Sequence, residues 1–428
     1  MRPILFLVSC LVVLGGLATQ PHRAQAATGS CLAAGVAERC TVWTGKVTFI
    51  DDADTLRVDL DRDGSRRPIK VRVTGIQAME QTVYTSNPAR RRGQCHAVEA
   101  TARLEALIRR SRWRVRLSAQ DPSSRSGVRW RRSVAVKWGG RWRDVGRRLV
   151  AEGHALWLPN GTEWAWNRDY SRLSAQAATK GVGLWNTAHC GAGPHQESPL
   201  RVVVNADADG NDNDFLNGEW VKVRNLDPVN AVSLGGWWLR DSALRRFTFP
   251  PYATLGPNEE LTVFVGDGQS TWTEFFWGQR RGVFENAVGD RGMGDGAYLF
   301  DPQGDLRAAM VYPCRLNCVH PYRGVIGIEA KARGREWVTL RNLAGFPVDL
   351  DGLRMESLPY SYAFPRASVL QPGEEMRIYV EGDPGADTRL ERHWGETGPI
   401  LNNRGDVVRL RSFDDIEVAC AAYGDRAC

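Results

Sequence analysis

The amino-acid sequence predicts a multidomain, mainly β protein in which a first unit of strands and helices precedes two tandem β-sandwich units. Three observations lead to this prediction. Two apolar-alternating segments flank a Gly-containing turn between Thr48 and Glu80, which is a β-hairpin signal. Helical periodicity disappears after a Gly/Pro-rich linker at residues 191–199. Beyond the linker, a pattern of short strands repeats at an offset of roughly 115 residues.

The N-terminal segment, residues 1–26, is predicted to be an export signal. It has a positive start, an apolar run from Ile4 to Ala18 and a small-residue cleavage site at Ala24-Gln25-Ala26. We therefore expect a secreted protein, either free or held at the cell surface, with no membrane span in the mature chain. The 428 residues suffice for two to four domains, and the 43% hydrophobic and 25% charged content is typical of globular proteins.

Eight cysteines remain once the export signal is removed, and an even number in an exported chain indicates disulfides. Their connectivity does not follow from the sequence alone. Proximity favours Cys31–Cys40, Cys314–Cys318 and Cys420–Cys428, which leaves Cys95 with Cys190.

Positive charge is concentrated between Arg90 and Val150, where eighteen Lys or Arg stand against four acidic residues. This segment carries +14, so the rest of the chain, whose total is +7, carries −7. A basic patch of this density suits a polyanion, nucleic acid first, and the alternative is a solvated basic face. Tryptophans that can stack on unpaired bases interleave with it: Trp113, Trp130, Trp138, Trp142 and Trp157.

The hairpin itself carries side chains suited to phosphodiester cleavage. Asp52 and Asp54 open it, Arg72 lies within its second strand, and Glu80 follows that strand. Carboxylates can hold a hard cation, a guanidinium can bind phosphate oxygens, and a glutamate can activate water. The alternative for the two aspartates is an ordinary turn.

These motifs resemble those of the thermonuclease family, the staphylococcal-nuclease-like enzymes. The family's acidic turn is matched by Asp52-Ala53-Asp54-Thr55, and its arginine-to-glutamate run by residues 72–80. Its second catalytic arginine is matched best by Arg132, with Arg131 as the alternative. The resemblance covers roughly residues 45–185.

The resemblance implies a fold, a cofactor and a set of site residues. The fold is a five-stranded barrel of the oligonucleotide-binding type (OB-fold) with packed helices, expected over residues 27–190. The cofactor is Ca²⁺. The catalytic residues are Arg72, Glu80 and Arg132, the metal ligands Asp54, Gln77 and the Ala78 carbonyl, the supporting residues Asp52 and Thr55, and the nucleic-acid-binding residues Arg131 and Trp157.

The chain departs from the family pattern at Gln77, Met79 and Ala53, which replace an aspartate, a proline and a glycine. Because a glutamine oxygen brings no charge, Gln77 is expected to weaken cation affinity. The resulting hypothesis is a secreted, Ca²⁺-dependent nuclease that cleaves DNA, RNA or both by in-line attack of water activated by Glu80. One alternative is a catalytically impaired nucleic-acid-binding protein.

The repeated half resembles the lamin tail domain, an immunoglobulin-like β-sandwich. Glu219-Trp220-Val221 recurs as Glu336-Trp337-Val338, and both are followed by an arginine-asparagine pair and, later, a phenylalanine-proline. We expect the two sandwiches over residues 200–318 and 319–428. The family has no shared catalytic site, so the match implies a protein or cell-envelope partner, or a spacer. A second alternative is therefore a surface scaffold or adhesion protein.

Two further features carry less chemistry. The histidines show no metal-ligand pairing in the sequence, and His96, on a predicted helix, is expected to be a surface or packing residue. The acidic segment 207–214 is either a solvated loop between strands or a structural calcium site.

Overall fold

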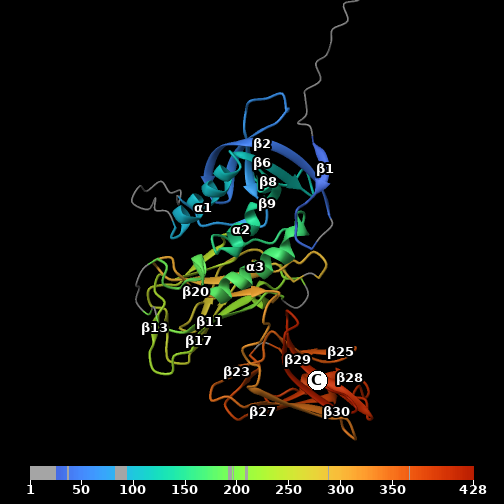
Figure 1. Cartoon of the computed structure of the whole chain (residues 1–428). Helices are drawn as coiled ribbons and strands as arrows, with labels where there is room; N and C mark the ends of the chain where they lie inside the picture. The colour runs from blue at the N-terminus through green and yellow to red at the C-terminus, as the bar shows by residue number, and fades with distance from the viewer. Residues whose placement is uncertain are drawn as a thin grey trace, which may run out of the picture.

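The computed structural model describes residues 26–35, 38–81, 94–190, 195, 197–207, 211–287, 289–365 and 367–428. Nearly all of the expected export signal, and residues 191–194 and 196 of the expected linker, lie outside this set. Figure 1 shows a barrel with three helices, a first β-sandwich beneath it and a second sandwich at the C-terminal end. No helix among the described residues is both long and apolar enough to cross a bilayer.

Five strands of the first unit close into a barrel. Their spatial order is β2 (Arg39–Asp52), β3 (Thr55–Leu60), β4 (Ile69–Val73), β8 (Arg129–Trp138) and β6 (Arg114–Ala119), and β6 pairs back with β2. Short strands extend this sheet: β1 (Ala27–Ser30), β7 (Arg125–Ser126) and β9 (Arg141–Asp144). Alternate residues of β3 and β4 point inward, so Leu56, Val58, Val71 and Val73 are buried in the core. The hairpin of β3 and β4 confirms the strand prediction for this segment.

Three helices cover the barrel. They are α1 (Ala97–Arg110), α2 (Val145–Ala151) and α3 (Asn167–Lys180). Helix α1 buries Ala100, Leu104 and Leu107, at the helical spacing of one apolar face. The Asp144 side chain caps α2 by accepting from the Arg147 N–H (3.0 Å). A two-stranded ribbon of β5 (Ile76–Gln77) and β10 (Leu156–Trp157) completes the unit.

The two sandwiches have the same topology. In the first, one sheet has the order β11 (Leu200–Asn205), β12 (Trp220–Asn225), β17 (Glu260–Phe264), β18 (Glu274–Phe276), and the other β15 (Arg246–Thr248), β14 (Trp238–Arg240), β19 (Asp295–Phe300), β20 (Leu306–Tyr312). In the second, these orders recur as β21 (Ile326–Lys331), β22 (Trp337–Asn342), β27 (Glu375–Glu381), β28 (Glu391–Glu396) and as β25 (Tyr360–Ala363), β24 (Leu353–Ser357), β29 (Gly405–Ser412), β30 (Glu417–Gly424). A short ribbon accompanies each, β13 (Val232–Ser233) with β16 (Thr254–Leu255) and β23 (Val348–Asp349) with β26 (Val369–Leu370).

The repeated glutamate has the same structural task in both copies. Glu219 Oε2 accepts from the N–H groups of Val283 (2.7 Å) and Phe284 (3.3 Å). Glu336 Oε2 accepts from two successive N–H groups at the equivalent place, those of Ile400 and Leu401. The carboxylate therefore ties a loop to the residue that directly precedes a central strand, β12 or β22, which explains why the glutamate belongs to the repeat.

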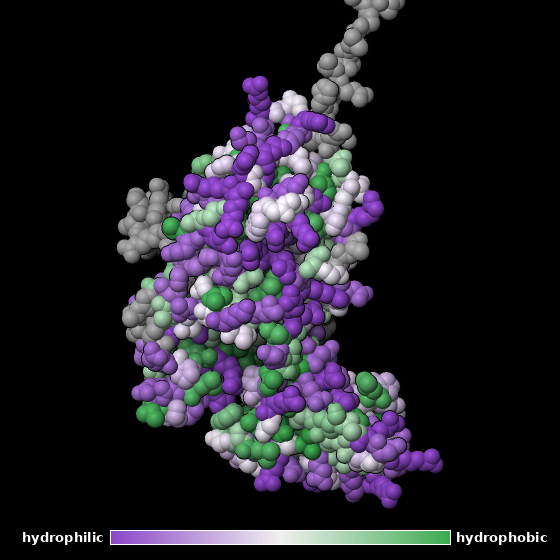
Figure 2. Space-filling model, viewed as in Figure 1, coloured by the Kyte–Doolittle hydropathy of each residue, from purple (hydrophilic) through white to green (hydrophobic). Residues whose placement is uncertain are grey.

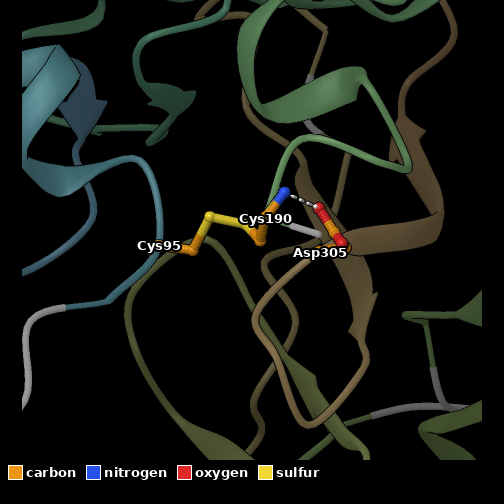
Figure 3. Close-up of side chains that lie close together, drawn as sticks. All are labelled: Cys95, Cys190 and Asp305. Carbon is orange, nitrogen blue, oxygen red and sulfur yellow. Dashed lines mark hydrogen bonds between the residues drawn. A yellow bond between two sulfur atoms is a disulfide. The ribbon is translucent and has the colours of Figure 1, made fainter. Parts of the chain in front are cut away.

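All four proposed disulfides are confirmed: Cys31–Cys40, Cys95–Cys190, Cys314–Cys318 and Cys420–Cys428. The Cys95–Cys190 bridge joins the residues before α1 to the end of the barrel unit. Figure 3 shows that Asp305 of the first sandwich reaches this bridge, where its Oδ1 accepts from the Cys190 N–H at 2.6 Å.

The barrel unit and the first sandwich share a small apolar core. The barrel unit contributes Met79, Ala97, Leu156 and Leu184, and the sandwich Trp238, Tyr298, Phe300 and Leu306. The Trp238 and Phe300 rings stack with centroids 4.2 Å apart. The first sandwich is therefore packed against the barrel unit.

The second sandwich is held to the first by an ion pair between Lys222 and Asp349 and by the Arg224 guanidinium over the Phe346 ring (3.8 Å).

We predict that Trp238→Ala lowers the free energy of unfolding by about 3 kcal/mol, because it removes a large side chain from this shared core. Differential scanning calorimetry should show the barrel unit and the first sandwich losing stability together. Trp272→Ala is the matched control, since Trp272 is 73% exposed whereas Trp238 is 6% exposed. A loss confined to the sandwich transition would show that the contact is not energetically shared.

Candidate active site

Asp54 occupies a tight turn between β2 and β3, which matches the acidic turn implied by the family resemblance. Its N–H donates to Asp52 Oδ1 (3.0 Å), which holds the two aspartates side by side. The Asp54 side chain is buried (1% exposed), with Oδ1 accepting from Thr55 Oγ1 (2.8 Å) and Oδ2 from the Ala78 N–H (2.8 Å). The turn thus reaches across the barrel edge to the segment that follows β5.

Arg72 forms a buried ion pair with Asp54. It lies on β4 opposite Thr55, and its Nη1 is 2.7 Å from Asp54 Oδ1. The two side chains are 6% and 1% exposed, so the charges are largely removed from water and depend on each other. The strand pairing therefore places a guanidinium and a carboxylate together at one end of the barrel.

Gln77 links this ion pair to Glu80. Its Oε1 accepts from Arg72 Nη2, and its Nε2 donates to Glu80 Oε1 (3.2 Å) and to the Ala78 carbonyl (3.1 Å). An ionised aspartate at this position could not do this, because it has no donor to offer Glu80. The turn that brings Gln77 back over Arg72 is made at Gly75, whose φ is +77° and whose absent Cβ would lie 3.0 Å from the Tyr170 ring.

Burial and the charge of Asp54 perturb the carboxyl groups of Asp52 and Glu80. Burial, followed by the charge of Asp54, raises the pKa of Asp52 to about 7. The same two causes raise the pKa of Glu80, while the positive charges of Arg72 and Arg129 oppose the shift. The Glu80 backbone is fixed by Gln94, whose Oε1 accepts from the Glu80 N–H and whose N–H donates to the Glu80 carbonyl (both 2.8 Å).

A cavity of about 320 Å³ opens beside these groups, between the barrel unit and the first sandwich. The barrel unit lines it with Arg72, Gln77, Arg129 and Arg131. The sandwich forms the opposite wall with residues that include Leu244, Arg245 and Glu285. Four arginines and two carboxyl groups line the cavity, so it suits an anionic ligand.

Arg131, not Arg132, lies on the cavity side of β8. Strand β8 runs parallel to β4 with Arg131 opposite Arg72, and alternate residues point to opposite faces. The Arg132 side chain is turned away and buried, donating to the carbonyls of Arg131 (2.6 Å) and Pro122 (2.7 Å) and stacking on Trp43. The structure therefore places Arg131, the alternative for the second arginine of the site, at the cavity and turns the preferred Arg132 away from it.

The expectation that Trp157 stacks on nucleic-acid bases is wrong. Its side chain is fully buried in the barrel core, because β10 pairs with β5 and turns the ring inward. It is not available to stack on a base.

The sequence did not single out Arg129, which donates to Thr55 Oγ1 (3.2 Å) and lines the cavity. Its position two residues before Arg131 was the available signal, since both then share one strand face.

The remaining sequence-predicted site residues do come together: Asp52, Asp54, Thr55, Arg72, Gln77, Ala78 and Glu80. The lamin tail domain family model matches residues 195–314, the first sandwich. No match to the thermonuclease family accompanies it. Searching the curated proteins gave no match to the chain. The comparisons thus identify one mainly β, immunoglobulin-like part of the protein.

We predict that Asp54→Ala destabilises the protein by about 3–5 kcal/mol, because it leaves the Arg72 charge buried without a partner. The double substitution Asp54→Ala with Arg72→Met should recover part of this loss, and urea titration of all variants measures it. Glu105→Ala, which breaks the exposed pair with Arg109, is the control and should cost less than about 1 kcal/mol. Equal losses in the single and double variants would contradict the coupling.

Proposed function

We propose that the protein is a nuclease of the thermonuclease-like type, secreted and Ca²⁺-dependent, with an oligonucleotide-binding barrel as its catalytic unit. The observation that carries the proposal is the chain of contacts from Asp54 through Arg72 and Gln77 to Glu80, at the edge of an arginine-lined cavity. These contacts place the Arg72 guanidinium, a group that can bind phosphate, and the Glu80 carboxylate, a candidate base, on either side of Gln77. Phosphodiester hydrolysis uses both kinds of group.

The donor set fits a hard cation. Burial and the negative charge of Asp54 disfavour the ionised forms of Asp52 and Glu80, a conflict that a divalent ion would relieve. Asp54, with the carbonyl oxygens of Gln77 and Ala78, would hold Ca²⁺, which prefers oxygen ligands. When bound, the ion would neutralise charge on the phosphate. Because Asp54 Oδ1 and Gln77 Oε1 already accept from Arg72, binding requires this arginine to turn toward the substrate.

The chain's own residues supply the rest of the mechanism. Arg72 and Arg131 would bind the phosphate oxygens from adjacent strands, and Glu80 would take a proton from the attacking water. The water oxygen then bonds to phosphorus, the bond to the leaving sugar oxygen breaks, and that oxygen takes up a proton. Gln77 would hold the Glu80 carboxyl in place as a positioning residue.

The central test is digestion of single-stranded DNA by the mature protein with Ca²⁺ and with a chelator. We predict Ca²⁺-dependent cleavage that Glu80→Gln slows by at least about 100-fold, the usual contribution of a general base. Glu105→Gln, an exposed glutamate on α1, should cleave as the wild type does. Undiminished cleavage by Glu80→Gln would exclude the proposed base.

A second candidate function is nucleic-acid binding without cleavage. The Arg72–Asp54 ion pair favours it, because Arg72 both occupies a cation ligand and is itself withheld from phosphate. Tight DNA binding with no cleavage at any Ca²⁺ concentration would support this candidate and reject the nuclease.

Both candidates require Arg131 to contact phosphate. Arg131→Gln should weaken DNA affinity and reduce the slope of log affinity against log salt by about 0.7, the value of one single-strand phosphate contact. Arg132→Gln should instead lower thermal stability and leave the slope unchanged, since Arg132 bonds to backbone carbonyls. The opposite result would restore Arg132 as the phosphate ligand.

The pH profile tests Glu80 as the base. A base must be ionised, so cleavage should rise with pH through the pKa of Glu80, which burial raises above its usual range. Arg129→Gln removes a cation that lowers this pKa, and should therefore move the rising limb to higher pH. Arg125→Gln is the control, because Arg125 is exposed and stacks on Trp130. A limb unmoved by Arg129→Gln would argue against Glu80.

A further inference from the structure

Three histidines distant in the sequence meet at the start of α1. His96 Nδ1 lies 2.7 Å from His189 Nε2, and His96 Nε2 lies 2.9 Å from His154 Nδ1. The sequence shows no metal-ligand pairing among the histidines, yet the fold brings these three rings together. His96 is 4% exposed, so it is a buried centre with an imidazole on each side rather than a surface residue.

The Cys95–Cys190 disulfide brings two of these rings together. His96 follows Cys95, and His189 precedes Cys190. The disulfide holds the Cα atoms of the two cysteines 5.9 Å apart and so keeps the neighbouring histidines close together. The signal in the sequence is this adjacency, Cys-His at one end and His-Cys at the other, and it becomes informative only once the two cysteines are known to pair.

Glu99 completes a set of ligand atoms. It lies three residues after His96, one turn along α1, and a carboxylate oxygen of Glu99, a ring nitrogen of His96 and one of His189 all lie within 4.8 Å of one another. Glu99 and His189 are exposed, which leaves a path for an ion to enter.

His154 is suited to a supporting role. A metal-ligating histidine usually donates its other ring N–H to an acceptor that orients it, and His154 Nδ1 lies where it would accept from His96 Nε2. Behind it, Glu152 is paired with Arg103 (2.6 Å), so the charges of this second layer are balanced.

We propose that His96 Nδ1, His189 Nε2 and the Glu99 carboxylate form a binding site for a divalent transition-metal ion, Zn²⁺ first, with water as the fourth ligand. Two imidazoles and a carboxylate with an open position are a donor set that Zn²⁺ accepts. The ion replaces the hydrogen bond between His96 and His189, and the separation of the two ring nitrogens must widen from 2.7 Å by roughly 0.6 Å to suit tetrahedral Zn–N bonds. This inference does not depend on the nuclease proposal.

Isothermal titration of the tag-free, full mature chain with Zn²⁺ tests the site. The expected result is one tightly bound equivalent in the wild type. His154→Ala should weaken binding by about 10–100-fold, the cost of losing an orienting partner, and His189→Ala should weaken it further. His393→Ala, which lies in the second sandwich beside Asp387 (3.0 Å), should leave affinity unchanged.

Three results would overturn the proposal. The first is a His189→Ala variant that binds Zn²⁺ as tightly as the wild type, and the second is a wild type that binds no stoichiometric ion. The third is loss of the bound ion in Asp54→Ala but not in His189→Ala, which would assign it to the acidic cluster of the candidate active site. Because His189 is exposed, its substitution is not expected to disturb folding, and circular dichroism of the variant verifies this.

Discussion

The buried ion pair between Arg72 and Asp54 is the constraint on which the candidate active site depends. Neither charge has enough water around it to be stable alone, so each fixes the other. Through Asp54 the pair ties the β2–β3 turn to the Ala78 backbone, and through Arg72 it engages Gln77 and hence Glu80. One interaction thereby positions the pairing of β3 with β4, the turn at Asp54 and the Glu80 side chain.

The first sandwich contributes to this site as well as to the architecture. Its loops form one wall of the arginine-lined cavity, and its Trp238 and Phe300 pack on the segment that carries Met79, next to Glu80. Figure 2 shows hydrophilic side chains over much of the visible face of the barrel unit. The first sandwich, which matches the lamin tail domain model, thus lies directly beside the candidate active site.

Local patterns carried the correct predictions. The hairpin, the duplicated sandwich and three of the disulfides each follow from residues that are close in the sequence or from a repeat of them. The fourth disulfide, Cys95–Cys190, spans 95 residues and was the pair that remained once the other three were assigned. The errors came from non-local pairing. Whether Arg131 or Arg132 faces the cavity depends on the register of β8 against β4, and Trp157 is buried because β10 joins β5. The histidine cluster likewise requires a bridge over 95 residues.

The shared apolar core also sets an order for biosynthesis. The chain emerges from its N-terminus, so Met79, Ala97, Leu156 and Leu184 are made well before the sandwich residues that cover them. Until residue 306 has emerged, the barrel unit presents an uncovered apolar face, a species prone to association with other chains. Asp305, which closes over the Cys190 backbone, arrives at the same moment. Maturation of the barrel unit is thus timed by the synthesis of the domain that follows it.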